Sequence, residues 1–101
     1  MRDIAREELI AELRGLRADL ARQGITRVAL FGSRARRDNR PDSDVDLVVD
    51  VDAGRKFSLI DLVGVVHTVE DRVGLDANIF MRRSLDAAFR TTVDRDQVVI
   101  F

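Results

Sequence analysis

The most constraining feature of the chain is the pair Gly32-Ser33, followed after ten further residues by Asp44-Val45-Asp46. The Gly-Ser pair ends the apolar run 28–31, and the aspartate pair begins a second run that continues through residues 47–49. Side chains at positions i and i+2 of a strand point to the same face, so both carboxylates face one side. They repel each other unless a cation lies between them, and a hard divalent cation such as Mg²⁺ suits their oxygens.

The Gly-Ser turn suits a different chemical group. Its backbone N–H groups and its hydroxyl are donors of the kind that bind phosphate. Taken alone, an Asp-x-Asp is most often a surface pair, Gly-Ser is an ordinary turn, and Ser43-Asp44 is turn chemistry that leads into a strand. The conjunction of these features at two strand ends is far more specific, and it indicates a metal–nucleotide site.

Composition limits the alternatives. A chain of 101 residues, 46% hydrophobic and 35% charged, fits one small globular domain over residues 1–101. Without cysteine it forms no disulfide and no thiolate metal site. Its apolar runs are too short to span a membrane and its first residues lack a signal-peptide core, so we expect a cytoplasmic protein. The net charge of −1 gives no general attraction to nucleic acid, so we expect no direct nucleic-acid binding.

Hydrophobic periodicity predicts an α+β fold. A leucine stripe predicts a helix over residues 3–23, Ser58 is a candidate N-cap for a helix that ends before Gly74, and a third helix begins at Ser84 and runs to about residue 93. Strands are expected at residues 27–31, 45–51, 75–80 and 97–101. We therefore expect a small mixed sheet of three or four strands with helices packed on one face. The connection between the first two strands allows either direction of pairing, and the open face would present Asp44, Asp46 and Asp76.

The motif resembles a known superfamily. The stretch Phe31-Gly32-Ser33-Arg34-Ala35-Arg36 and the later stretch Pro41-Asp42-Ser43-Asp44-Val45-Asp46-Leu47 are similar to the nucleotidyltransferases that include DNA polymerase beta. The chain most resembles the minimal nucleotidyltransferases, the MNT-domain antitoxins that are paired with HEPN-domain toxins in prokaryotes. The resemblance implies that Gly32 and Ser33 contact the nucleotide phosphates and that Asp44 and Asp46 hold two Mg²⁺ ions. Asp76 is then the candidate for the third metal-binding carboxylate.

Two positions depart from the family pattern. Many relatives have glycine where this chain has Arg37, a change that could narrow the phosphate loop or add a phosphate or partner contact. The pair Ala77-Asn78 is more polar than the apolar residues expected beside the third carboxylate.

The implied chemistry is an in-line attack of a hydroxyl on the α-phosphate of ATP, with pyrophosphate as the leaving group. Two metal ions can clamp the attacking and leaving oxygens, and Asp76 could accept the hydroxyl proton. Ser33, with Arg34 or Arg36, would hold the β- and γ-phosphates. The catalytic set is therefore Asp44, Asp46 and Asp76, and the nucleotide-binding set is Gly32, Ser33, Arg34 and Arg36.

Three functions are consistent with this pattern. The first is a Mg²⁺-dependent enzyme that transfers AMP from ATP to a hydroxyl side chain of a partner protein and so acts as the antitoxin of a HEPN toxin. The second is an inactive antitoxin that neutralises its toxin by binding. The third is a small-molecule adenylyltransferase, although such relatives usually carry an added helical domain. The partner is expected to dock over the open face of the sheet, as part of a homo- or hetero-oligomer, and the few aromatic residues predict an open adenine pocket.

Overall fold

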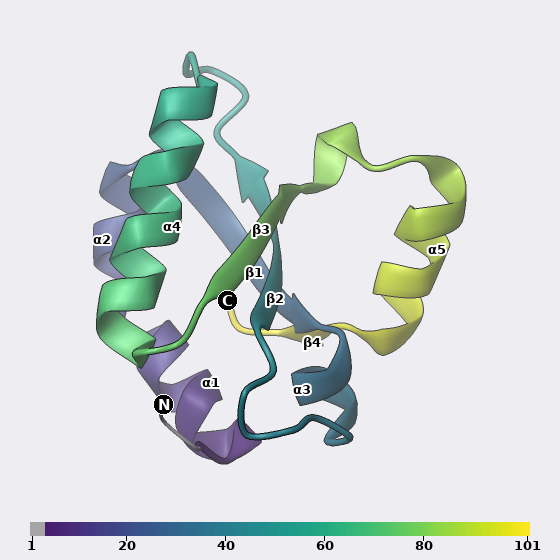
Figure 1. Cartoon of the computed structure of the whole chain (residues 1–101). Helices are drawn as coiled ribbons and strands as arrows, with labels where there is room; N and C mark the ends of the chain where they lie inside the picture. The colour runs from purple at the N-terminus through teal and green to yellow at the C-terminus, as the bar shows by residue number, and fades with distance from the viewer. Residues whose placement is uncertain (1–3) are drawn as a thin grey trace.

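A four-stranded mixed sheet forms the centre of the molecule, in the order β3-β2-β1-β4 (Figure 1). This is a computed structural model, and it describes residues 4–101. Strands β1 and β2 pair antiparallel, β3 runs parallel to β2, and β4 pairs antiparallel with β1 at the edge. The bounds are β1 Ile25–Phe31, β2 Val45–Val51, β3 Ala77–Met81 and β4 Val98–Val99. The predicted α+β class with a small mixed sheet is confirmed, and the first two strands prove to be antiparallel.

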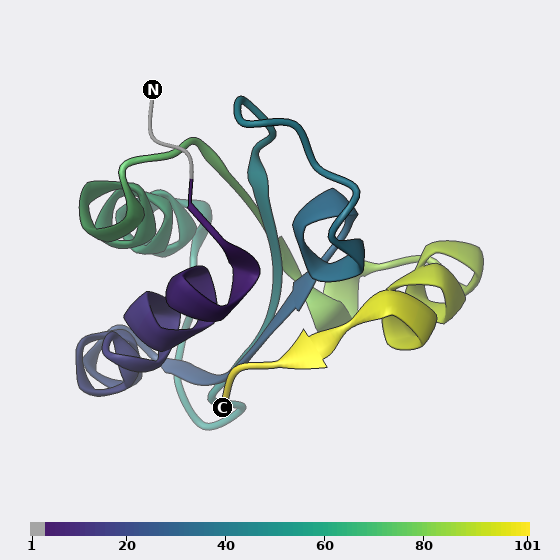
Figure 2. The same ribbon diagram turned by 90° about the horizontal axis from the view of Figure 1, so that it is seen from below.

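Three helices cover one face of the sheet: α1 Arg6–Arg14, α2 Arg17–Arg22 and α4 Leu59–Val73 (Figure 2). They bury the apolar side chains that alternate along β2, namely Val45, Leu47 and Val49. The same core contains the predicted leucine stripe of the N-terminal region, in which every member is buried: Leu9, Leu13, Leu16 and Leu20. Burial of this stripe and of the strand face provides the main driving force for folding.

The single helix predicted for residues 3–23 is wrong, because the segment is broken into α1 and α2 at Gly15 and Leu16. Residue 3 itself lies outside the described residues. Glycine is a poor helix former, and the guanidinium of Arg72 lies 3.0 Å from the place that a Cβ on residue 15 would occupy. The break therefore lets α1 approach α4 closely while the leucine stripe stays buried.

Helix α4 has the boundaries that its sequence predicts. The Ser58 side chain accepts from the Asp61 N–H at 3.3 Å and the Asp61 carboxylate accepts from the Ser58 N–H at 2.8 Å, which completes a capping box. The hydrogen bonds to the Asp61 carboxylate lower its pKa, those from the Ser58 backbone first. Gly74 ends the helix at φ 71°, a backbone conformation that glycine adopts without strain. This turn delivers the chain into β3.

The second face of the sheet is covered at one end. After the short helix η1 Arg82–Ser84, helix α5 Ala87–Asp96 packs Val93 against Ala29 and Val48 on this face (Figure 2). The cap of α5 is Asp86, whose carboxylate accepts from the Phe89 N–H at 2.8 Å, so the predicted helix start at Ser84 is wrong. The prediction that helices pack on one face only is wrong, because α5 covers part of the second face. Only one end of that face stays open. Within residues 4–101, no helix is long and apolar enough to cross a membrane.

Candidate functional site

The two predicted metal ligands lie together at the open end of the second face. Asp44 immediately precedes β2 and is exposed, while Asp46 lies inside the strand and is half-buried. Asp46 is paired with Phe31 of β1 on one side and with Asn78 of β3 on the other. The alternation of β2 thus sends its apolar residues into the core and its two carboxylates to the opposite side.

Asn78 joins the two carboxylates. Its amide nitrogen Nδ2 donates to Oδ2 of Asp44 at 3.1 Å and to Oδ1 of Asp46 at 3.0 Å. From the sequence, Asn78 stands out only as unexpectedly polar. The available signal was its spacing, because Asn78 lies two residues after Asp76 and therefore on the same face of β3.

Gly32 supports Asp46 from the other side. Its φ of 76° lies in the left-handed region, and a Cβ at this position would collide with the Asp46 carboxylate. The Gly32 carbonyl accepts from the N–H groups of Ala35 and Arg36, both at 3.1 Å, which begins the short helix α3 Ser33–Arg36. A short helical turn therefore follows the Gly-Ser pair. Gly32 is required by the backbone and by Asp46, and the half-buried Ser33 follows it directly.

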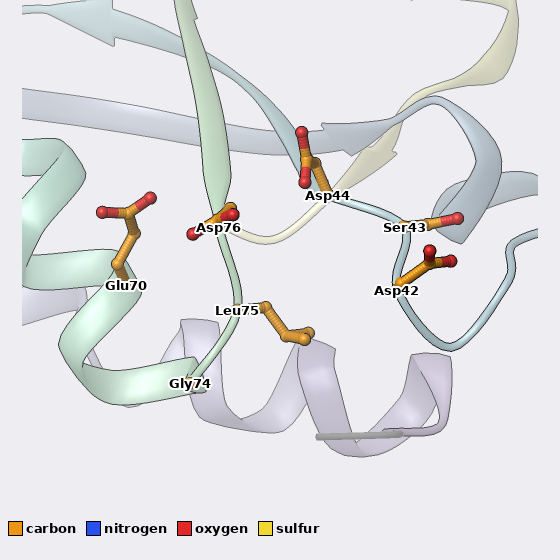
Figure 3. Close-up of a pocket in the computed structure, with 7 residues that line it drawn as sticks. All are labelled: Asp42, Ser43, Asp44, Glu70, Gly74, Leu75 and Asp76. Atoms are coloured by element: carbon orange, nitrogen blue, oxygen red, sulfur yellow. The ribbon is translucent and has the colours of Figure 1, made fainter. Parts of the chain in front are cut away.

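Asp76, the predicted third carboxylate, lies near Asp44. It immediately precedes β3, and its carbonyl accepts from the Val45 N–H at 2.8 Å. Both carboxylates line a hollow of about 200 Å³ (Figure 3). Glu70, which also lines it, accepts from the Ala77 N–H at 2.9 Å and so anchors the start of β3 to α4. No group of three or more carboxylate or imidazole side chains within residues 4–101 is close enough to hold a metal ion, so Asp76 does not complete a preformed triad.

Arg34 does not fit its predicted role as a phosphate ligand. Its side chain is almost completely buried, with 2% exposure. The guanidinium donates to three backbone carbonyls, those of Ser43 at 2.9 Å, Pro41 at 3.2 Å and Ile4 at 3.4 Å. Buried charge is tolerated only with such partners. The prediction is corrected accordingly: Arg34 holds the loop that leads into Asp44, and it thereby positions the carboxylate pair.

Arg36 is the predicted phosphate-binding arginine that reaches the surface. Its guanidinium bonds to Asp38 at 3.0 Å and to Asp96 of α5 at 3.3 Å. The hydrogen bond that Arg36 donates to Asp38 raises the pKa of Arg36 above its ordinary value. The hydrogen bond from Arg95, followed by that from Arg36, lowers the pKa of Asp96. Exposed ion pairs of this kind exchange readily with a phosphate, because each contributes little stability.

The backbone at Arg37 adopts a conformation that favours glycine. It ends α3 with φ 67°, the only positive φ of a non-glycine residue within residues 4–101. A left-handed conformation costs an L-residue about 1–2 kcal/mol, a cost that glycine avoids. The side chain forms an ion pair with Glu7 of α1. Arg37 thus contributes a contact within the chain, in addition to its backbone strain.

An aromatic cluster that the sequence pattern does not predict lies beside the carboxylate pair. The rings of Phe31, Phe80 and Phe89 have centroids 5.6–5.9 Å apart, and the last two are 37% and 38% exposed. Phe31 is paired with Asp46, and Phe80 is paired with Val48 on β2. Because Phe89 comes from α5, the cluster could not be assembled without knowing where that helix packs.

The donor set at the open end fits a divalent cation. Asp44 and Asp46 present hard oxygen atoms on one side, which suits Mg²⁺ or Mn²⁺. Their carboxylates are already spanned by a single hydrogen-bond donor, so one small cation could contact both. Mg²⁺ usually takes one or two carboxylates and completes its shell with water and substrate phosphate. Two protein carboxylates therefore suffice to begin such a site.

The comparisons with known proteins agree with this geometry. The family model for the nucleotidyltransferase domain matches residues 10–97. The protein adenylyltransferase MntA of Thermococcus cleftensis is 32% identical over 79 residues, which cover 78% of each chain. A solved structure described as a minimal nucleotidyltransferase superposes with a TM-score of 0.80 at 34% identity, over 94% of this chain and 95% of that one.

A more distant match extends the fold comparison. A chain in the complex of a tri-AMPylated Shewanella oneidensis HEPN toxin with an MNT antitoxin superposes with a TM-score of 0.69 at 14% identity, over 95% of this chain and 71% of that one. At this identity the match concerns the fold alone. The closer matches define the class, and the chain belongs to the nucleotidyltransferase family. The predicted resemblance to the minimal nucleotidyltransferases and the predicted enzyme class are confirmed.

Proposed function

We propose that the chain is a Mg²⁺-dependent nucleotidyltransferase that moves AMP from ATP to a hydroxyl side chain of a partner protein, and that this partner is a HEPN toxin. The observation that carries the proposal is the placement of Asp44 and Asp46 on one side of β2, with Asp46 directly beside Gly32, which Ser33 follows in the chain. The relative named as a protein adenylyltransferase supports the choice of a protein acceptor. Distant fold neighbours from toxin–antitoxin complexes agree with it.

The phosphates of ATP would lie between the carboxylate pair and α3. The hydroxyl of Ser33 and the guanidinium of Arg36 are the protein groups that would bind the β- and γ-phosphates there. Gly32 leaves room for the Asp46 carboxylate at the strand end, beside the backbone that the triphosphate would approach. Arg34 acts indirectly, because it holds the loop that positions Asp44. Bound Mg²⁺ would supply positive charge against the phosphate oxygens and make the attacking hydroxyl more acidic.

The transfer itself forms one bond and breaks one. The hydroxyl oxygen of the acceptor attacks the α-phosphorus, the bond to the oxygen that bridges to the β-phosphate breaks, and pyrophosphate leaves. Asp76 is the side chain proposed to take the hydroxyl proton, since it lines the hollow beside Asp44 and is exposed to the approaching acceptor. Asp44 and Asp46 would hold the divalent cation, which would supply positive charge to the reacting phosphate.

The acceptor is proposed to dock over the open end of the sheet. The half-exposed rings of Phe80 and Phe89 offer an apolar surface next to the carboxylates, which suits an aromatic hydroxyl side chain such as tyrosine. The hollow at Asp76 is too small to enclose a nucleotide, since binding cavities usually measure about 300–1,000 Å³. A docked partner would therefore complete the site.

The proposal is tested by co-expressing the chain with a HEPN toxin encoded beside it and measuring the toxin's mass. The expected result is a toxin that carries one or a few AMP groups, and an unmodified toxin when Asp44→Asn and Asp46→Asn are combined. Asp76→Asn should abolish transfer while nucleotide binding persists. If the double variant neutralises the toxin equally well and no mass is added, the chain acts by binding alone.

A further inference from the structure

We propose that Asn78 is a placeholder for the cation: its amide holds Asp44 and Asp46 together in the metal-free protein and must release them when a divalent ion binds. This inference rests on the proposed function, because it concerns the same carboxylate pair. It adds a residue that the motif does not contain and that acts before any nucleotide chemistry. In this role Asn78 is a positioning residue, and it sets the ion concentration at which the site fills.

The hydrogen-bond chemistry allows only one orientation of the amide. Both Asp44 and Asp46 carry acceptors, so the side that faces them must be the NH₂ group and not the carbonyl oxygen. That group has two N–H donors, and one bond goes to each carboxylate, at 3.1 Å and 3.0 Å. A single neutral donor thus spans the gap that two negative charges would otherwise widen by repulsion.

The surroundings fix this geometry from both sides. Register places Asn78 directly opposite Asp46 on the neighbouring parallel strand. On its other side Asp46 is packed so tightly against Gly32 that no Cβ could fit there. The Asp46 carboxylate is therefore confined between the glycine and the amide, and it has little freedom to move away from Asp44.

The amide of Asn78 and a bound cation would compete for the same carboxylate oxygens. A cation that contacts both carboxylates needs the same oxygen atoms that Asn78 occupies, Oδ2 of Asp44 and Oδ1 of Asp46. Hydrogen bonds to charged groups contribute measurably to stability, so displacing them weakens apparent ion affinity. Removing the amide should then make the ion bind more tightly, although the metal-free protein becomes less stable.

The test is a titration with Mn²⁺, followed by electron paramagnetic resonance of the free ion, on the wild-type chain, on Asn78→Ala and on Asn78→Val. Valine suits a strand, so the second variant guards against poor folding of the first. We expect Mn²⁺ to bind both variants at least about fivefold more tightly than the wild type, because fivefold corresponds to one hydrogen bond of ordinary strength and Asn78 donates two. Mg²⁺ should displace the bound Mn²⁺ in all three proteins.

The matched control is Asn39→Ala, because Asn39 is the other asparagine of the chain and its amide donates to the neighbouring Arg40 carbonyl at 3.1 Å. Its Mn²⁺ affinity should equal that of the wild type. In buffer with a chelator, Asn78→Ala should lower the melting temperature, and it should do so less when Asp44→Asn and Asp46→Asn are already present.

The outcomes separate the two proposals. If the wild type binds Mn²⁺ and both Asn78 variants bind it equally or more weakly, the placeholder role is wrong while the metal site stands. Weaker binding would instead make Asn78 a ligand of the ion. If the wild type binds no Mn²⁺ at all, the metal site of the proposed function fails, and the role of Asn78 fails with it.

Discussion

The two faces of β2 differ in composition because apolar and polar residues alternate along the strand. On the inner face, Val45, Leu47 and Val49 are buried under three helices. On the outer face, Asp44 and Asp46 stay at the open end, while Val48 is covered by α5. The inner face needs close packing, and the outer end needs like charges held side by side. Residues that stabilise the fold and residues proposed to bind the cation therefore alternate along one strand.

The largest expected effect tests that separation directly. Leu47→Ala should destabilise the protein by about 2–5 kcal/mol, because Leu47 is fully buried and its truncation leaves a cavity. The neighbouring Asp46→Asn should cost less than Leu47→Ala in the absence of metal, because it keeps the side-chain volume and relieves the repulsion from Asp44, although it weakens the hydrogen bond from Asn78. Urea denaturation monitored by circular dichroism measures both. Equal losses for the two variants would break the distinction between the faces.

The second comparison sets Arg34 against Arg36. Arg34→Ala should cost more than about 2 kcal/mol of stability, because three backbone carbonyls lose a charged donor. Arg36→Ala should leave stability nearly unchanged, since Arg36 is exposed and Asp96 keeps its ion pair with Arg95, but it should weaken ATP binding. Thermal denaturation and calorimetric titration with ATP in the presence of Mg²⁺ distinguish the two effects. A stable Arg34→Ala variant that has lost only ATP affinity would restore the original phosphate-binding prediction.

A smaller, stabilising effect is expected at Arg37. Arg37→Gly should raise stability by about 0.5–1 kcal/mol, because glycine relieves the left-handed backbone and the lost ion pair with Glu7 is exposed. Arg37→Ala is the matched control, since it removes the same ion pair but keeps the strain. Destabilisation by Arg37→Gly to the level of Arg37→Ala would show that the contact outweighs the strain.

The smallest effect concerns acid stability at the start of α4. The pKa of Asp61 is lowered by its hydrogen bonds from Ser58. A lowered pKa in the folded state means that the carboxylate contributes stability above its unfolded-state pKa, and that this contribution disappears as the pH falls through the folded-state value. Asp61→Asn should therefore lower the melting temperature at neutral pH and converge with the wild type in acid. A constant difference from neutral pH to acid would contradict this account.

Much of the fold was predictable because it depends on local patterns. The alternation of β2 gave its bounds and faces correctly, and Ser58 with Gly74 marked the limits of α4. The break at Gly15 was missed because the leucine stripe continues across it, and the decisive contact comes from Arg72 in a helix far along the chain.

In the candidate site, too, the features that depend on local pattern were predictable and those that depend on distant contacts were not. Gly32, Ser33, Asp44 and Asp46 could be found from spacing, since they lie at the ends of adjacent strands. The burial of Arg34 could not be predicted, because charged residues are seldom buried and its acceptors belong to the loop and the N-terminal segment. The bridge from Asn78 depends on the register of β3 against β2, and register follows from tertiary packing.

The most direct test of the central claim is the shift in melting temperature that Mg²⁺ and ATP produce together. The carboxylate pair at the open end of the outer face is proposed to bind both, and a ligand that binds only the folded state stabilises it. The account predicts a clear rise for the wild type at saturating Mg²⁺-ATP, a smaller response to ATP without Mg²⁺, and no Mg²⁺-dependent rise when Asp44→Asn and Asp46→Asn are combined. An unchanged melting curve for the wild type, or an equal rise in the double variant, would contradict it.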